Sequence, residues 1–157
     1  MHVVEQTAVI EAPMATVMEA IDDVTRIPTW ATVPGVVENV QGQGVGMTYD
    51  WRFEVSGLAF RGKTEVIEQT DDSLITKTTG DIPSIWTINL TQVGRSSTII
   101  QVVVEYALPN SFVEPLVDVV VQRLARPDVA NENMQRFKEM VEERVKIVDT
   151  QTAIANQ

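Results

Sequence analysis

The sequence contains no cysteine, and its one histidine is His2. Without cysteine there is no disulfide, no thiolate nucleophile and no cysteine-based zinc site. A single histidine at the fringe of the chain also leaves the body of the domain without a Ser-His-Asp triad or a histidine-based metal site. We interpret His2 as an exposed terminal residue, and we expect neither a bound metal nor another cofactor.

Basic residues are scarce as well. The chain has 12 lysines and arginines against 22 aspartates and glutamates, a formal net charge of -10. Such a protein repels nucleic-acid phosphates and anionic membrane surfaces, so neither is an expected partner. The sequence has no apolar run near the ~20 residues that cross a bilayer, and no leader-like start. These absences favour a cytoplasmic protein without stable membrane insertion.

The length of 157 residues predicts one domain, which we place at 1–148, followed by a flexible tail at 149–157. A chain of this size buries roughly 70% of its unfolded surface, which is enough for a core and a cavity.

The most informative pattern is an alternation between residues 47 and 55. Side chains on a strand point alternately to opposite faces, so one face is apolar and aromatic and the other is charged. Ser56-Gly57 is typical of a two-residue hairpin turn. The resulting hairpin places Tyr49 opposite Thr64, Trp51 opposite Gly62, and Phe53 opposite Phe60.

The other elements follow from similar patterns. We expect a strand at 3–11, an amphipathic helix opened by Pro13, a short helical piece at 24–31, and strands from 35 to about 108. One of these strands lies near 74–79, and a second hairpin pairs Leu90 with Ile100 and Trp86 with Val104. The glycine-rich segment 42–46 is interpreted as a bend or bulge, because no helix follows it to make a phosphate loop.

The C-terminal third is predicted to be helical. Ser111 and Glu114 have the spacing of a capping box, and Pro115 falls in the first turn. The segment 112–124 is apolar around most of its circumference, so it is covered on more than one side or faces a ligand. Pro127 is expected to kink or break the helix, after which residues 130–148 form a regular apolar stripe. The fold class is therefore α+β, with a curved antiparallel sheet of about seven strands around a long C-terminal helix.

This order and several local motifs resemble the START-like (SRPBCC) superfamily, with its helix-grip fold, over residues 3–148. The likeness is strongest to the bacterial polyketide cyclase/dehydrase and lipid-transport group, within a superfamily that includes carriers, receptors and enzymes. The motifs that carry the resemblance are Ile10-Glu11-Ala12-Pro13, Val17, Ile21-Asp22-Asp23, Pro28-Thr29-Trp30, Gly35-Val36, Gly44-Val45-Gly46 and Phe137-Lys138.

The resemblance implies an apolar pocket between the sheet and the C-terminal helix. The same side chains could instead be ordinary core, and the residues alone leave both interpretations open. Pockets of this kind are mostly apolar with a few converging polar groups. The predicted ligand-binding residues are Tyr49, Trp51, Phe53, Phe60, Thr64, Trp86, Tyr106, Phe112, Leu116, Val120 and Leu124.

Chemistry would need a polar group on the inner face. The candidates for a catalytic role are Tyr49, Glu68 and Tyr106, since a phenol can donate a hydrogen bond and a buried carboxyl can act as an acid. The alternative for Glu68 is a solvated position at a strand end, and for the tyrosines a core ring whose hydroxyl reaches water. Ser84 and Thr98 are further inward polar candidates.

Three hypotheses for function remain. The first is a carrier or binding protein for a hydrophobic small molecule such as a lipid, an isoprenoid or a polyketide-like compound. The second is a polyketide cyclase or dehydratase. The third is an interaction module in which the apolar helix 112–124 packs against a partner chain, an arrangement that allows a homodimer.

Overall fold

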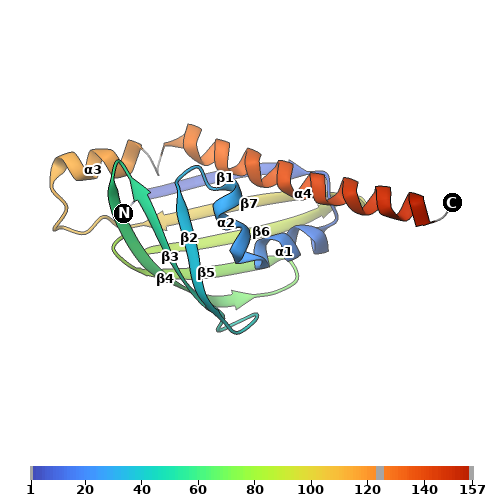
Figure 1. Cartoon of the computed structure of the whole chain (residues 1–157), viewed down its shortest axis with the longest axis horizontal. Coiled ribbons are helices and arrows are strands. Elements are labelled where there is room, and N and C mark those ends of the chain that lie inside the picture. Colours follow the sequence, from blue (N-terminus) through green and yellow to red (C-terminus); the bar gives the residue numbers. More distant parts are fainter. Residues whose placement is uncertain (1, 123–125, 156–157) are drawn as a thin grey trace.

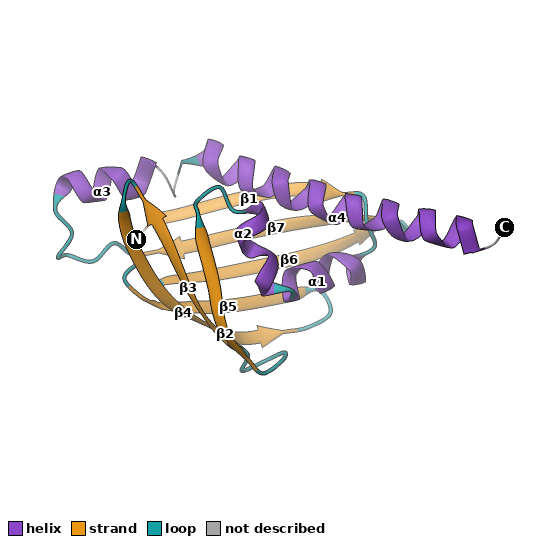
Figure 2. Ribbon diagram, viewed as in Figure 1, coloured by secondary structure: helices purple, strands orange, loops and turns teal. Residues whose placement is uncertain are grey.

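An antiparallel sheet forms the body of the protein, which we describe from a computed structural model (Figures 1 and 2). The structure describes residues 2–122 and 126–155. In these ranges seven strands follow one another in the order β1-β7-β6-β5-β4-β3-β2 across the sheet. The strands are β1 (His2–Ile10), β2 (Gly35–Gln41), β3 (Thr48–Val55), β4 (Leu58–Gln69), β5 (Ser73–Gly80), β6 (Ser84–Val93) and β7 (Ser97–Tyr106).

Both predicted hairpins are confirmed in register. Tyr49 lies opposite Thr64 and Phe53 opposite Phe60, while Trp86 lies opposite Val104 in the β6–β7 pair. The β3–β4 turn has a positive φ at Ser56 (50°) and at Gly57 (82°). Positive φ at both central residues is the geometry of a turn whose twist matches that of the flanking strands. This turn fixes which residues of β3 and β4 share a face.

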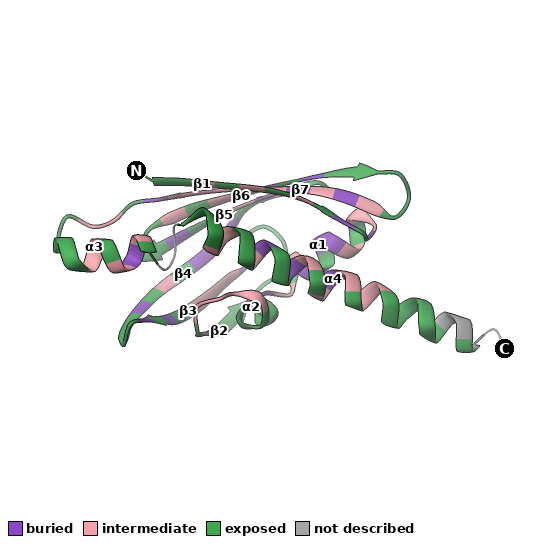
Figure 3. Ribbon diagram, turned by 90° about the horizontal axis from the view of Figure 1, so that it is seen from above, coloured by how far each residue is buried: buried purple, intermediate pink, exposed green. Residues whose placement is uncertain are grey.

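Helices cover one face of the sheet. After β1 come α1 (Met14–Asp22), a short 3₁₀ turn η1 (Val24–Arg26) and α2 (Ile27–Trp30). The long helix α4 (Pro127–Ala155) lies along β1 and also contacts α1 and α2. Figure 3 shows α4 between two parts of the curved sheet, with β1 and β5–β7 on one side and β2, β3 and the short helix α2 on the other, and the last turns of α4 extend past the strands. In the described ranges, no helix has the length and apolar character needed to cross a membrane.

The main core lies where these elements meet. Ile10, Val17 and Ile100 are almost fully buried, and from α4 Met134, Phe137 and Val141 pack into the same cluster. The stripe predicted for the last helix therefore packs into the core as far as Val145, whereas Val148, at its predicted end, is 55% exposed. The ring of Trp30 meets Phe137 edge-on with 5.7 Å between centroids, which joins α2 to α4.

The C-terminal helix is divided, as Pro127 suggests. Helix α3 (Glu114–Val120) ends before the interruption, and Pro127 is the first residue of α4. The predicted capping box is wrong, because α3 begins at Glu114 and its N-cap, Val113, makes no side-chain capping bond. A helix capped by Ser111 would need a hydrogen bond from the nitrogen of Pro115, which carries no proton. Beyond residue 149, where the sequence predicts a flexible tail, α4 continues as helix to Ala155.

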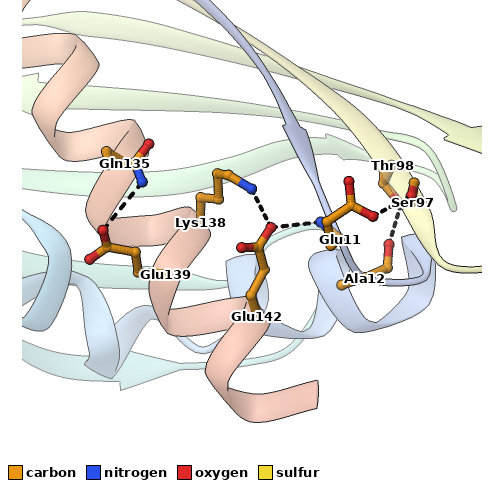
Figure 4. A network of polar contacts seen from close by, with 8 residues as sticks. All are labelled: Glu11, Ala12, Ser97, Thr98, Gln135, Lys138, Glu139 and Glu142. Carbon is orange, nitrogen blue, oxygen red and sulfur yellow. Dashed lines mark hydrogen bonds and ion pairs between the residues drawn. The ribbon is translucent and has the colours of Figure 1, made fainter. Parts of the chain in front are cut away.

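A polar network ties α4 to the end of β1 (Figure 4). The Glu142 carboxylate accepts hydrogen bonds from the backbone N–H of Glu11, at 2.8 Å, and from the Lys138 ammonium. Ser97 donates to the Glu11 carboxylate at 2.7 Å, and the Thr98 hydroxyl donates to the Ala12 carbonyl at 2.7 Å. Burial raises the pKa of Glu142, but its hydrogen bonds and the nearby lysines outweigh that effect, so the net pKa is lowered.

The Glu142→Gln variant should lower the free energy of unfolding by about 1 kcal/mol at neutral pH, since it removes the charge from two hydrogen bonds. Because the folded pKa of Glu142 is lowered, its stabilisation is present above the unfolded carboxyl pKa and is lost as the pH falls through the folded pKa. Urea unfolding at several pH values measures both effects. Glu139→Gln is the matched control, since Glu139 is exposed and accepts only from Gln135 on its own helix. Equal losses in both variants, or a pH-independent difference, would contradict this account.

Candidate ligand-binding face

A row of hydroxyl groups runs across the concave, helix-covered face of the sheet. The strand registers place Tyr49 opposite Thr64, Thr64 opposite Thr78, Thr78 opposite Ser84, and Ser84 opposite Tyr106. Neighbouring strands lie ~4.8 Å apart, so this row crosses the sheet from β3 to β7 as an almost continuous polar line. Four of the five residues in this row are predicted from the sequence to face inward, and the strand register adds Thr78 as the fifth.

The centre of the row is tightly buried and hydrogen-bonded. The hydroxyls of Thr64 and Thr78 lie 2.7 Å apart, and their residues are only 2% and 5% exposed. Tyr49 lies directly opposite Thr64 on the neighbouring strand. Every buried side-chain polar atom in the described ranges has a partner, as buried hydroxyls require. The centre of the row is therefore a buried, hydrogen-bonded part of the interior.

Both tyrosines of the row are held in the neutral form at physiological pH. Burial raises the pKa of Tyr49 above its ordinary value, and the nearby Thr64 side chain offsets this only in part. Burial also raises the pKa of Tyr106, whose ring stacks on His2 with 5.0 Å between centroids. A neutral phenol is a hydrogen-bond donor and a poor general base near pH 7. These side chains are thus suited to orienting a ligand.

An aromatic cluster lies at the far end of the same face. Trp51 stacks on Phe53 with 4.3 Å between ring centroids, Phe53 stacks on Phe60 at 5.3 Å, and Phe112 follows at 6.0 Å. Helix α3 adds Leu116, Val119 and the fully buried Val120 to the cluster. Of the apolar face predicted from the alternation, Trp51, Phe53 and Val55 therefore belong to the cluster with α3, whereas Met47 and Tyr49 pack in the main core. Packing in this cluster accounts for much of the apolar surface of α3.

The middle of the concave face is less completely filled. Trp86 and Val104 lie opposite each other between the two ends and are only half-buried. Among the described residues they belong to neither the main core nor the aromatic cluster. The next residue along this row is Val4 of β1, adjacent on the same face to Gln6, whose amide donates to the Pro127 carbonyl at 3.4 Å. The interruption between α3 and α4 therefore borders the row that contains Trp86.

Two hollows are prominent in the described part of the protein, and neither lies between the sheet and α4. A small one between α2, β2 and Trp51 has a volume of about 10 Å³, enough for about one water molecule. A larger groove of about 500 Å³ lies over the outer side of β2 to β5. Neither of these two hollows offers space for a large ligand on the concave face.

Most of the predicted binding residues come together on this face. The rings of Trp51, Phe53 and Phe60 pack with Phe112, Leu116 and Val120 on the α3 side. Leu124 lies outside the described residues. Thr76 and Val104 also lie in the middle rows of this face, although the predicted binding residues do not include them.

Two polar candidates have other positions. Glu68 is exposed, which agrees with the solvated position at a strand end and not with an inward catalytic position. A bulge between Val66 and Glu68 shifts the pairing by one residue, and Gln69 in place of Glu68 then lies opposite the buried Leu74. Thr98 is fully buried, but its hydroxyl is bonded to the Ala12 carbonyl at the other end of the sheet, where it fixes the chain after β1.

Comparison with known proteins agrees with this architecture. The model of the family described as polyketide cyclase / dehydrase and lipid transport matches residues 1–142. The chain belongs to this family. No curated protein matches it significantly.

Solved structures show the same fold at low sequence identity. The Zhui aromatase/cyclase from Streptomyces sp. R1128 is 13% identical, with a TM-score of 0.73 over 92% of this chain and 95% of that one. A protein of Thermus thermophilus is 20% identical, with a TM-score of 0.72 over 88% and 96% of the two chains. A START superfamily protein from Mycobacterium smegmatis is 18% identical, with a TM-score of 0.61 over 94% and 99%. At these identities the likeness shows the fold alone.

Replacing Thr64 by valine should destabilise the protein by about 1–3 kcal/mol, because it deprives the buried Thr78 hydroxyl of its partner. Thr78→Val should cost about as much, since it leaves the Thr64 hydroxyl without a partner in the same way. The matched control is Thr79→Val, because Thr79 follows Thr78 in β5 and is exposed on the opposite face of the sheet. Thermal or urea unfolding measures these losses. A loss in Thr79→Val as large as in Thr64→Val would contradict the buried network.

Proposed function

We propose that this protein binds a hydrophobic small molecule, such as a lipid, an isoprenoid or a polyketide-like compound, on its concave face. The observation that carries the proposal is the hydroxyl row from Tyr49 to Tyr106, set between two apolar clusters. A few fixed polar groups inside an apolar surface are the usual composition of a small-molecule site. Family membership supports the same class of ligand.

The binding position is centred on Trp86 and Val104. These residues expose apolar surface on the concave face, and covering that surface supplies roughly 25 cal/mol per Å². The ligand enters beside Pro127, where the C-terminal helix is interrupted and a long bond from Gln6 holds the first turn of α4. Movement at this interruption opens the face without breaking the packing of Phe137 and Val141 in the main core.

Binding is favoured over catalysis by the chemistry of the row. An acid–base mechanism needs a group that exchanges a proton near neutral pH. Of the three catalytic candidates, Glu68 is exposed on the other face, and the pKa values of Tyr49 and Tyr106 are raised by burial. The two tyrosines therefore act here as donors that orient a carbonyl, ether or hydroxyl group of the ligand.

The test is native mass spectrometry of gently purified protein, followed by titration with fatty acids, isoprenoids and aromatic polyketides. We expect a discrete apolar molecule to co-purify or to bind with one-to-one stoichiometry. A clean protein mass with no uptake from any of these classes would overturn the proposal. Turnover of a polyketide that is lost in Tyr49→Phe or Tyr106→Phe would favour a cyclase instead.

Trp86→Ala should weaken binding of the selected ligand by about tenfold or more, because it removes the large half-buried ring in the middle of the concave face. Ile85→Ala is the control, since Ile85 is the neighbouring residue on the outer face and is 38% exposed. Calorimetric titration of both variants with the same ligand measures the effect. Equal affinities in the two variants would place the ligand elsewhere.

A further inference from the structure

The outer face of the sheet carries a second feature, independent of the concave face. The groove of about 500 Å³ lies within the ordinary volume range of small-molecule sites. Its floor is formed where the backbones of β4 and β5 approach each other at Gly62 and Gly80. A Cβ atom on Gly80, whose φ is 126°, would lie 2.5 Å from the Arg61 carbonyl oxygen, so this approach requires glycine.

The acidic side chains around this groove already have partners. Glu38 accepts a hydrogen bond from the Arg52 guanidinium at 3.0 Å. Asp50 accepts from the Asn39 amide at 2.8 Å, although it lies opposite Lys63 in the register. Asp81 accepts from the backbone N–H of Arg61 at 2.8 Å. Each of these carboxylates therefore has a partner other than the side chains of Arg61 and Lys63 on β4.

Arg61 and Lys63 lie two residues apart on the outer face of β4, so their stems are about 7 Å apart. Within residues 2–122 and 126–155 neither side chain forms a hydrogen bond or an ion pair. Arg61 also lies directly opposite Arg52 on β3, an arrangement of like charges that destabilises an antiparallel pair. Three of the 12 basic residues of a strongly acidic chain thus line one groove.

We propose that this groove binds a small soluble oxyanion, carried on a molecule with a phosphate or carboxylate group, between Arg61 and Lys63. The planar guanidinium of Arg61 offers two parallel donors to such a group, and the Lys63 ammonium adds a mobile charge. A membrane or nucleic acid fits less well, because its extended negative surface would meet Glu38, Asp50, Asp81 and the net charge of -10.

The experiment is calorimetric titration of the whole protein with inorganic phosphate and, separately, with acetate, at neutral pH and with chloride at matched ionic strength as the reference. We expect saturable binding of at least one oxyanion beyond the chloride response, and the stronger of the two shows which group the site prefers. Binding of neither would overturn the proposal.

Three variants locate the site. Arg61→Gln should weaken oxyanion binding at least tenfold and Lys63→Gln several-fold. Arg95→Gln, the same change in the exposed turn between β6 and β7, should alter it less than twofold. Arg61→Gln should also keep or raise the melting temperature of the unliganded protein, because the like-charged pair is removed. Unchanged affinity in folded Arg61→Gln and Lys63→Gln, or an equal loss in Arg95→Gln, would contradict the assignment.

Discussion

The register of the antiparallel ladder is the constraint on which the other features of this protein depend. Because side chains alternate between the faces, a shift of one residue in any pair would move a whole strand's apolar set to the solvent side. The tight turn at Ser56-Gly57 fixes β3 against β4, and the β6–β7 turn does the same near the other edge. The aromatic cluster, the hydroxyl row and the outer basic groove are three consequences of one pairing pattern.

The helices divide the concave face into two packing units. Helix α4, with α1 and α2, completes the main core at one end, and α3 completes the aromatic cluster at the other. The interruption before Pro127 allows the two units to be covered by helices with different directions. A continuous rigid helix could not move over one unit without disturbing the other. The division therefore provides both a stable core and a part of the face that is less completely filled.

Local signals account for what the sequence predicts well. The two hairpin registers follow from short turns and strict alternation, and the stripe on α4 follows from its helical period. For Glu68 the sequence leaves an inward and a solvated position open, because the bulge that turns it outward leaves no distinctive pattern. Ser111 failed as a cap because Pro115 overrides a favourable spacing. The complete hydroxyl row depends on pairings among β4, β5 and β6, which no single turn specifies.

The pairing of the first strand with the last has a consequence for how the chain is made. Val4 meets Val104, and Glu11 meets Glu142, so β1 waits for a strand partner about 100 residues later, and its anchor at Glu11 for a partner 131 residues later. Contacts this distant in sequence slow folding, because the entropy of closing the loop must be overcome before they form. The strands from β2 to β6 can form hairpins with their neighbours during synthesis. β1 remains without its strand partner until β7 has been made.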